Sequence, residues 1–246
     1  MTRTAETEAA AIEAAIRAAG TPERAVSEQA YLKLSLEFTG TAVPAGRAII
    51  RAWRRDHPEL TPALLTGVAA ALWSRPVFDC RMAAVLLLAD QRARLTAADV
   101  PLLERLLRDS GTWALVDSLA ADVMGSLVER CPELAGTLDR WSQDPDFWLR
   151  RSALLALLVP LRRGAGDFER FARYADQMLD EREFFIRKAI GWVLRETAKR
   201  RPELVAGWLA PRISRASGVT VREAVKPLPP ARREDLLAAY RARRPA

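Results

Sequence analysis

Residues 183–200 read EFFIRKAIGWVLRETAKR, and their apolar side chains recur every three or four positions. Because successive residues of an α-helix are rotated by about 100°, this spacing gathers the apolar side chains on one stripe. The predicted core stripe consists of Ile186, Ala189, Ile190, Val193, Leu194 and Thr197. The opposite side of the predicted helix carries Lys188, Trp192, Arg195 and Lys199. The segment therefore predicts an amphipathic helix with a tryptophan among cations on its polar side.

Two earlier segments share this pattern of an aromatic or apolar opening, a charged residue and a long apolar run. They are residues 112–129, TWALVDSLAADVMGSLVE, and residues 146–163, DFWLRRSALLALLVPLRR. Trp113, Phe147 and Phe184 mark the three segments, at intervals of 34 and 37 residues. A period of this size is typical of HEAT-like helix pairs, which stack because a single pair cannot bury its apolar face. We expect a curved solenoid with a concave basic cleft; a globular bundle without repeats is the alternative.

The rest of the chain has the same helical spacing, without the alternating apolar pattern or the turns typical of β-hairpins. Prolines mark the expected helix starts and turns, for example at Pro22, Pro101 and Pro202. The predicted fold class is all-α, with helices of about 10 to 18 residues. We expect one domain over residues 1–246. N-terminal helices should occupy about 5–40, the repeat core about 41–226, and a C-terminal helix about 229–243.

The composition points to a large anionic partner. The 246 residues include 38 Lys and Arg against 31 Asp and Glu, a net charge of +7. Nucleic acid and an anionic membrane surface both fit such a charge. Glutamates interrupt the alanine-rich start, and the apolar runs are too short to cross a bilayer. We therefore expect a soluble cytoplasmic protein that does not enter a membrane.

Several common catalytic schemes lack their residues. His57 is the single histidine, which disfavours Ser-His-Asp, Cys-His and multi-histidine metal chemistry. Cys80 and Cys131 are far from any CxxC spacing, so neither a zinc site nor a disulfide framework is indicated. The glycine-rich loops that bind nucleotide phosphates between a strand and a helix are missing. We expect no metal and no cofactor.

Three groups of residues remain as candidates, each with two interpretations. Trp113 and Asp117 share one flank of a helix, although an aspartate near a helix start often only complements the helix dipole. Arg151, in an almost wholly apolar helix, needs either an internal carboxylate or a DNA phosphate. Trp192 and its neighbouring cations either pack on the next repeat beside a solvated face, or contact phosphates and a base.

EFFIRKAIGWVLRE, followed by AKRRPELV, resembles the most recognisable segment of AlkD-type DNA glycosylases, and DFWLRRSA precedes it at the expected distance. TWALVDS resembles the tryptophan-containing active-site stretch of that family. YLKLSLEFTGTAVPAGR and LWSRPVFDCRMAA resemble its first repeats. The resemblance covers roughly residues 31–222, in order and with few length changes.

The resemblance implies a role for each candidate. Asp117 corresponds to the catalytic aspartate, and Trp113 and Trp192 to the tryptophans that flank the lesion. Arg151 and Arg195 correspond to arginines that contact DNA, and Tyr31 to a tyrosine near the lesion. We assign Lys188 and Lys199 to the same DNA-binding face from their helical positions. No cofactor is implied, and the implied partner of this monomer is double-stranded DNA that contains alkylated purines.

The implied reaction is monofunctional hydrolysis of the N-glycosidic bond of cationic N3- or N7-alkylated purines, without enclosing the base in a pocket. The family commonly has Trp-Trp-Asp where this chain has Thr112, Trp113 and Ala114. Smaller residues here should widen the cleft and admit bulky genotoxin adducts, unless Thr112 and Ala114 pack against a neighbouring helix. The alternative function is a noncatalytic HEAT-like scaffold that binds nucleic acid or protein.

Overall fold

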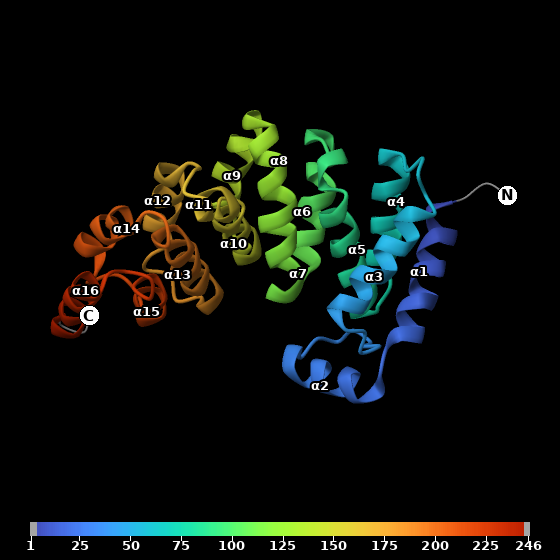
Figure 1. Cartoon of the computed structure of the whole chain (residues 1–246), viewed down its shortest axis with the longest axis horizontal. Helices are drawn as coiled ribbons and strands as arrows, with labels where there is room; N and C mark the ends of the chain where they lie inside the picture. Colours follow the sequence, from blue (N-terminus) through green and yellow to red (C-terminus); the bar gives the residue numbers. More distant parts are fainter. Residues whose placement is uncertain (1–3, 244–246) are drawn as a thin grey trace. The chain divides into compact units, whose positions relative to one another are not determined.

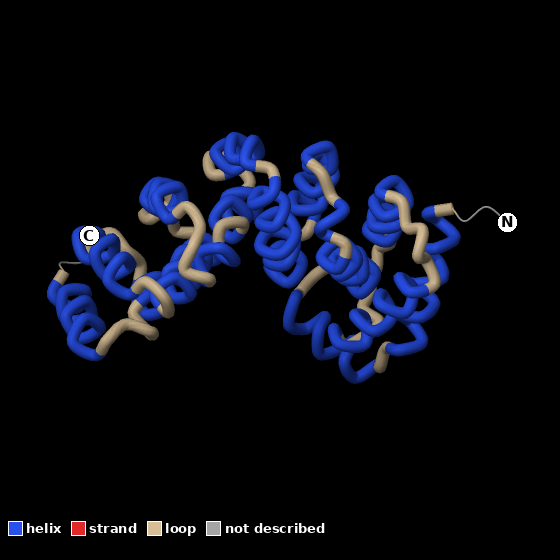
Figure 2. Tube along the Cα trace, turned by 45° about the horizontal axis from the view of Figure 1, so that its top comes forward, coloured by secondary structure: helices blue, strands red, loops and turns tan. Residues whose placement is uncertain are grey.

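The computed structural model describes residues 4–243, and the described chain is built from helices and loops (Figure 2). An isolated bridge between Glu37 and Val77 is the nearest approach to a strand in this range. The predicted all-α class is confirmed. The chain divides into two compact units, Met1–Cys131 and Pro132–Ala246.

The first unit is an assembly of helices packed side by side, except for α2, which lies across the bottom of the unit in Figure 1. α4 packs against both α1 and α5, and fully buried Leu65, Leu72 and Leu87 lie in this core. The helices are α1 (Ala5–Ala19), α2 (Pro22–Leu32), α3 (Val43–Arg55), α4 (Pro62–Trp73), α5 (Phe78–Asp90), η1 (Arg92–Arg94), η2 (Ala97–Asp99), α6 (Val100–Asp109), α7 (Trp113–Ser118), η3 (Leu119–Met124) and α8 (Gly125–Arg130).

The second unit is built around α13. This helix packs against α10, α11, α14 and, most extensively, α15. The helices are η4 (Pro132–Leu134), α9 (Ala135–Trp141), α10 (Phe147–Leu155), α11 (Leu158–Arg162), α12 (Phe168–Gln177), α13 (Phe184–Ala198), α14 (Pro202–Leu209), η5 (Ala210–Arg212), α15 (Gly218–Ala224) and α16 (Pro230–Ala242).

The repeat markers have equivalent places in the structure. Trp113, Phe147 and Phe184 are the first residues of α7, α10 and α13. The residue before each marker is the N-cap, and its side chain accepts a hydrogen bond from the second backbone N–H of the helix. Such a cap satisfies a backbone donor that has no partner inside the helix. Each segment therefore begins its helix by the same device.

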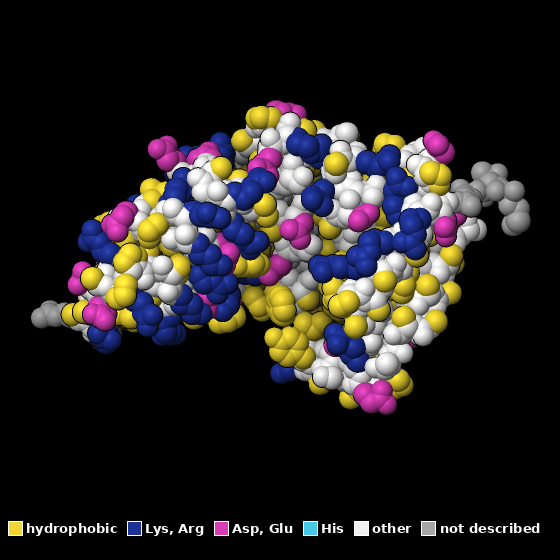
Figure 3. Space-filling model, in the orientation of Figure 1, with side chains coloured by type: hydrophobic (Ala, Val, Ile, Leu, Met, Phe, Trp, Pro, Cys, Tyr) yellow, Lys and Arg dark blue, Asp and Glu magenta, His cyan; other side chains and the backbone are white. Residues whose placement is uncertain are grey.

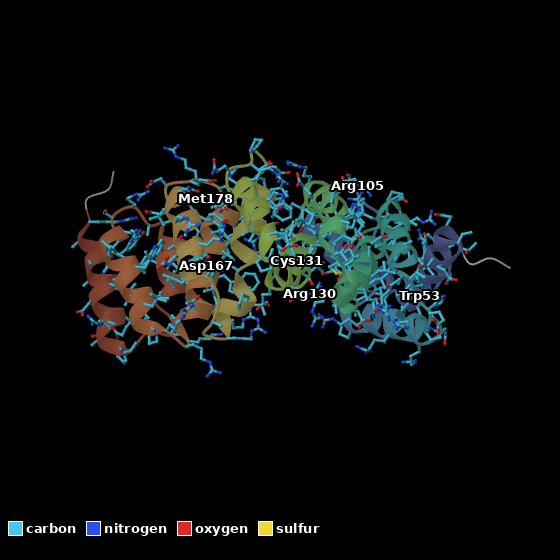
Figure 4. The ribbon with its side chains drawn as sticks, turned by 90° about the horizontal axis from the view of Figure 1, so that it is seen from above. Trp53, Arg105, Arg130, Cys131, Asp167 and Met178 are labelled. Carbon is cyan, nitrogen blue, oxygen red and sulfur yellow. The ribbon has the colours of Figure 1, made fainter. Side chains whose placement is uncertain are left out.

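Arginines connect successive repeats at a regular interval. Arg94 donates to the Leu60 carbonyl, 34 residues earlier. Arg130, which is labelled in Figure 4, donates to the Leu95 carbonyl, 35 residues earlier. In the second unit Arg170 donates to the Ala135 carbonyl and Arg201 to the Ala165 carbonyl, 35 and 36 residues earlier. The carbonyls of Leu60, Leu95 and Ala165 lie in loops, where a backbone acceptor otherwise needs water. Their constant separation supports the predicted repeat length.

Two helices are shorter than the sequence pattern predicts. The sequence of residues 146–163 predicts one continuous helix. In the structure the first helix ends at Leu155, and a second helix begins at Leu158. Pro160 explains the break, because it lacks the N–H that the carbonyl four residues earlier requires. Downstream of α7, the helical ladder widens into the π-helix η3. Over residues 4–243, no helix has the length and apolarity needed to cross a membrane.

Candidate nucleic-acid interface

The first unit presents Trp113 and Asp117 on one flank of α7. The Thr112 hydroxyl accepts a hydrogen bond from the Ala114 N–H at 3.3 Å, which fixes the start of the helix. The Trp113 side chain is 37% exposed and begins the first turn. Asp117 is half-buried and lies one turn later, so the two side chains are neighbours on the helix surface. This arrangement agrees with the sequence prediction.

Tyr31 lies against Trp113. It comes from the end of α2, and the two ring centroids are 6.4 Å apart with planes at 86°. Aromatic rings favour this edge-to-face arrangement, because the positive edge of one ring meets the negative face of the other. Tyr31 is 72% exposed. The structure therefore joins Tyr31, Trp113 and Asp117 in one open surface of the first unit.

The π-helix directly after α7 coincides with a four-residue spacing of apolar residues in the sequence. The Gly125 N–H donates to the Ala120 carbonyl five residues earlier, as in a π-turn. Four of the five predicted core residues recur at intervals of four, and a turn wider than 3.6 residues keeps them on one side. All five are buried: Leu115, Val116, Leu119, Val123 and Leu127. Short π segments occur frequently at functional sites, and this one begins two residues after Asp117.

The second unit presents the predicted polar face on α13. The predicted core stripe of this helix is wholly buried, from Ile186 to Thr197. Lys188, Trp192 and Arg195 are half-buried, and Lys199 is exposed. Figure 3 shows Lys and Arg side chains gathered over α13 and α15. Trp192 therefore lies within a cationic surface of the second unit.

Carboxylates that the sequence analysis missed hold these cations. Glu223, on α15, accepts hydrogen bonds from Lys188 at 3.1 Å, from Lys226 at 2.8 Å, and from Arg195. Lys188 and Glu223 are 35 residues apart, the interval of the repeat. That interval is the one sequence signal that points to Glu223.

Glu196 is the second of these carboxylates. It accepts from Lys199 at 2.8 and 2.9 Å, lies 3.0 Å from Arg162, and receives a weaker bond from Arg195 at 3.3 Å. The Glu196 side chain is 7% exposed, whereas that of Lys199 is 51% exposed. The carboxylate therefore lies beneath the cations rather than beside them.

The surrounding cations keep both carboxylates ionised. Burial alone would raise the pKa of Glu223. Hydrogen bonds from Lys226 and Lys188 and the charge of Arg195 outweigh burial and lower the pKa to about 2. Burial likewise raises the pKa of Glu196, and Lys199, Arg162 and Arg195 bring it below its ordinary value. Both groups therefore remain anionic throughout the neutral pH range.

The two arginines of α10 have different surroundings. Arg150 is half-buried and pairs with the half-buried carboxylate of Glu181 at 2.9 and 3.0 Å. Arg151 is 2% exposed, donates to the Phe185 carbonyl at 2.5 Å and lies 5.9 Å from the centre of the Phe185 ring. These contacts connect α10 to the first turn of α13. Sequence reasoning did not single out Phe185.

Thr112 does not widen an opening beside Trp113. Its side chain is buried, 4% exposed, and caps α7. Ala114 is half-buried. For Thr112, the structure favours the interpretation in which this residue packs inside the protein. An effect of the Thr112–Ala114 segment on lesion size would therefore have to come from Ala114.

The single histidine is packed inside the first unit. His57 is buried, stacks on Trp53 at a centroid distance of 4.2 Å, and places Nε2 3.0 Å from a carboxylate oxygen of Glu8. Trp53 donates to the same carboxylate at 2.8 Å, which ties α3 to α1. Among residues 4–243 there is no group of three or more His, Cys, Asp or Glu side chains placed to hold a metal ion.

Comparisons with known proteins agree with this architecture. The sequence matches the family described as DNA alkylation repair enzyme over residues 12–228. A predicted DNA alkylation repair enzyme from Enterococcus faecalis has a similar structure, with a TM-score of 0.76 and 23% identity, covering 84% of this chain and 95% of its own. AlkD2 from Streptococcus mutans is similar with a TM-score of 0.59 and 15% identity, covering 84% and 97%.

The structural likeness establishes an AlkD-type HEAT-like fold. The sequence identities are too low to support a conclusion about function. No functionally curated protein matches the sequence. The family match extends over most of the length of the protein, from the first helix to the loop before the last. The chain therefore belongs to the DNA alkylation repair enzyme family.

Proposed function

We propose that this protein is a monofunctional DNA glycosylase that hydrolyses the N-glycosidic bond of cationic N3- or N7-alkylated purines in duplex DNA. The observation that carries the proposal is the flank of α7, where Asp117 lies one turn from the exposed indole of Trp113 and Tyr31 lies edge-on to that indole. Membership of a DNA alkylation repair family supports the choice of substrate.

The chemistry needs only one carboxylate. An alkylated purine with a formal positive charge is already a good leaving group, so its departure does not require a strong general acid. The sugar becomes electron-deficient as the bond breaks, and the Asp117 carboxylate would stabilise that charge and orient the attacking water. The indole of Trp113 would offer its negative π face to the cationic base.

The exposed aromatic surface supports a reaction without a base pocket. Tyr31 and Trp113 have 72% and 37% of their surfaces exposed, so they form a contact surface open to a DNA duplex. Such a surface would not limit the size of the adduct, and we extend the proposal to bulky N3-adenine lesions. Comparing excision of 3-methyladenine with that of a bulky N3-adenine adduct tests this extension, and loss of the bulky activity alone in Ala114→Trp would support it.

The cations of the second unit would hold the DNA backbone. Lys188 and Lys199 have side chains 42% and 51% exposed, and Arg195 lies between them on the same face of α13. An ammonium has three donors, so an ion pair with Glu223 or Glu196 leaves further donors for a phosphate. Arg151 is buried, and it would support this surface by fixing the first turn of α13.

The deciding experiment incubates the protein with duplex DNA containing 7-methylguanine and measures the appearance of abasic sites. We expect excision that persists in EDTA, with no covalent protein–DNA adduct after borohydride treatment, because hydrolysis uses water instead of an amine. Tight binding without base release would instead favour a noncatalytic scaffold. An adduct trapped by borohydride would contradict the monofunctional mechanism.

A further inference from the structure

The basic surface of the second unit also contains two carboxylates beneath its cations. Its charge cluster consists of Glu223 with Lys188, Arg195 and Lys226, and Glu196 with Arg162, Arg195 and Lys199. The carboxylates lie inside, with side chains 10% and 7% exposed, whereas the lysine side chains are 42–56% exposed. In the charge cluster, two buried carboxylates therefore lie beneath a layer of more exposed cations.

Close packing of α15 against α13 places Glu223 beneath the cations. An added Cβ on Gly191 would lie 2.9 Å from Glu223 Cβ, closer than real Cβ atoms approach, and 3.1 Å from Thr220 Cα, which is tighter than most Cβ contacts. The glycine therefore lets α15 approach α13 closely enough for Glu223 to lie under Lys188 and Arg195. These cations are seven residues apart, two helical turns, and both reach the same carboxylate.

The charges of the cluster do not balance. Glu223 carries one negative charge and receives three cationic side chains, and Arg195 is shared with Glu196. A further anion would therefore be attracted to the surface. A DNA phosphate has the same kind of acceptor oxygens as a carboxylate, and arginine binds both groups in the same geometry.

We propose that Glu223 is a positioning residue that substitutes for a DNA phosphate, holding Lys188 and Arg195 in place and competing with the DNA backbone for them. This inference rests on the proposed function, because it takes the DNA duplex as the partner of the cationic surface. The competition weakens contact with undamaged DNA, so the protein leaves lesion-free sites more readily. Glu223 thereby limits nonspecific binding, which depends mainly on phosphate contacts.

Glu223→Gln tests this role because it keeps the size of the side chain and removes its charge. The freed donors of Lys188 and Arg195 would then bind phosphates. We expect the variant to bind a lesion-free duplex about tenfold more tightly at low salt, with a log–log salt slope steeper by about one to two units. Fluorescence anisotropy on a labelled, undamaged duplex, from about 50 to 200 mM salt, measures both quantities.

Asp176→Asn is the matched control. Asp176 lies on α12 and accepts from Arg212 and Arg215 across one repeat, so this variant makes the same charge change away from α13. We expect it to retain the wild-type salt slope. Equal steepening in both variants would overturn the inference, because net charge alone would explain the effect. An unchanged or shallower slope in Glu223→Gln would also overturn it.

Two further measurements separate folding and chemistry from this effect. If Glu223→Gln does not fold, Glu196→Gln tests the same competition through Lys199 and Arg162. Binding to undamaged DNA requires no excision, so the two hypotheses fail independently. Excision of 7-methylguanine with an unchanged salt slope in Glu223→Gln overturns only this inference. A steeper slope in a protein that releases no base supports the competition and contradicts the glycosylase proposal.

Discussion

At the scale of single residues, the carboxylate of Asp117 and the indole of Trp113 make the strongest prediction. We expect Asp117→Asn to fold and bind duplex DNA normally, but to excise 7-methylguanine at least about 100-fold more slowly under single-turnover conditions. The amide has the shape of the carboxylate but lacks the charge that stabilises an electron-deficient sugar. Single-turnover kinetics with excess enzyme isolate this step from binding and product release.

Asp122→Asn provides the control for this prediction. Asp122 lies five residues further along the same helical stretch, is exposed, and accepts a hydrogen bond from Ser118 at 2.7 Å. The substitution removes the same charge from the same unit. Excision at the wild-type rate is expected. If both variants retained activity, Asp117 would have no role in the chemistry.

Arg151 makes a second prediction at this scale, about stability. The guanidinium donates to the Phe185 carbonyl and lies under the Phe185 ring, and the side chain is buried. Arg151→Ala would leave that carbonyl without its charged donor, so we expect a loss of about 1–3 kcal/mol in the free energy of unfolding. Urea denaturation measures it. Arg200→Ala, at an exposed position, should change stability by less than about 0.5 kcal/mol.

Helical spacing was sufficient to predict that Trp113 and Asp117 share a flank, because neighbours on a helix are set by local geometry. It did not predict Glu223, whose partners Lys188 and Arg195 lie one repeat earlier. Such a pairing depends on how α15 packs against α13, which no single helix determines. Nor did it reveal that Arg151 binds a backbone carbonyl, because a carbonyl has no signature in the sequence.

At the scale of helices, Gly191 controls how closely α13 and α15 pack. Gly191→Ala would place a Cβ 2.9 Å from Glu223 Cβ and 3.2 Å from the Thr220 carbonyl oxygen. Because backbone atoms surround the site, the helices must separate. We expect a loss of about 1–3 kcal/mol in stability from overpacking, together with weaker ion pairs at Glu223. The midpoint of urea unfolding reports the first effect.

Gly207→Ala is the opposite case in the same unit. Gly207 lies within α14, is exposed, and an added Cβ would meet no atom within 4 Å. Alanine is the better helix former, so this variant should be more stable by about 0.5–1 kcal/mol. A gain in Gly207→Ala and a loss in Gly191→Ala would separate crowding from helix propensity. Equal changes in both would contradict the packing argument.

Apolar spacing predicted the core stripes of α7 and α13 correctly because burial follows directly from the helical period. The limits of α10 were less predictable. The apolar run from Trp148 to Leu161 conceals a break, and Pro160 is its only local signal. The widened turn of η3 was not predicted either, although a strict four-residue interval from Leu115 to Leu127 accompanies it.

At the scale of the whole molecule, we expect the carboxylates of cross-repeat ion pairs to contribute to how stability depends on pH. Burial raises the pKa of Glu223, but the cations around it lower it to about 2, from an ordinary value of 4.5. A hydrogen bond from Arg212 lowers the pKa of Asp176, and that of Glu196 is also lowered. Each group is more acidic in the folded protein than in the unfolded chain, so the folded state is stabilised where it is ionised.

This sign fixes the expected pH profile. The contribution of Glu223 is fully present above about pH 4.5, and it is lost as the pH falls towards 2 because the folded protein must then accept a proton. At 1.36 kcal/mol per pKa unit, the loss from this one group is at most about 3.4 kcal/mol. We expect the free energy of unfolding in urea to change little between neutral pH and about pH 5, then to decrease steadily.

Glu223→Gln isolates this contribution, because glutamine cannot titrate. The variant should begin less stable than the wild type at neutral pH, since three cationic side chains lose their shared partner. Its stability should then decrease less between about pH 4.5 and 2.5, so that the two profiles converge in acid. Parallel profiles would show that Glu223 does not contribute, and that other paired carboxylates, such as Asp176, account for acid unfolding.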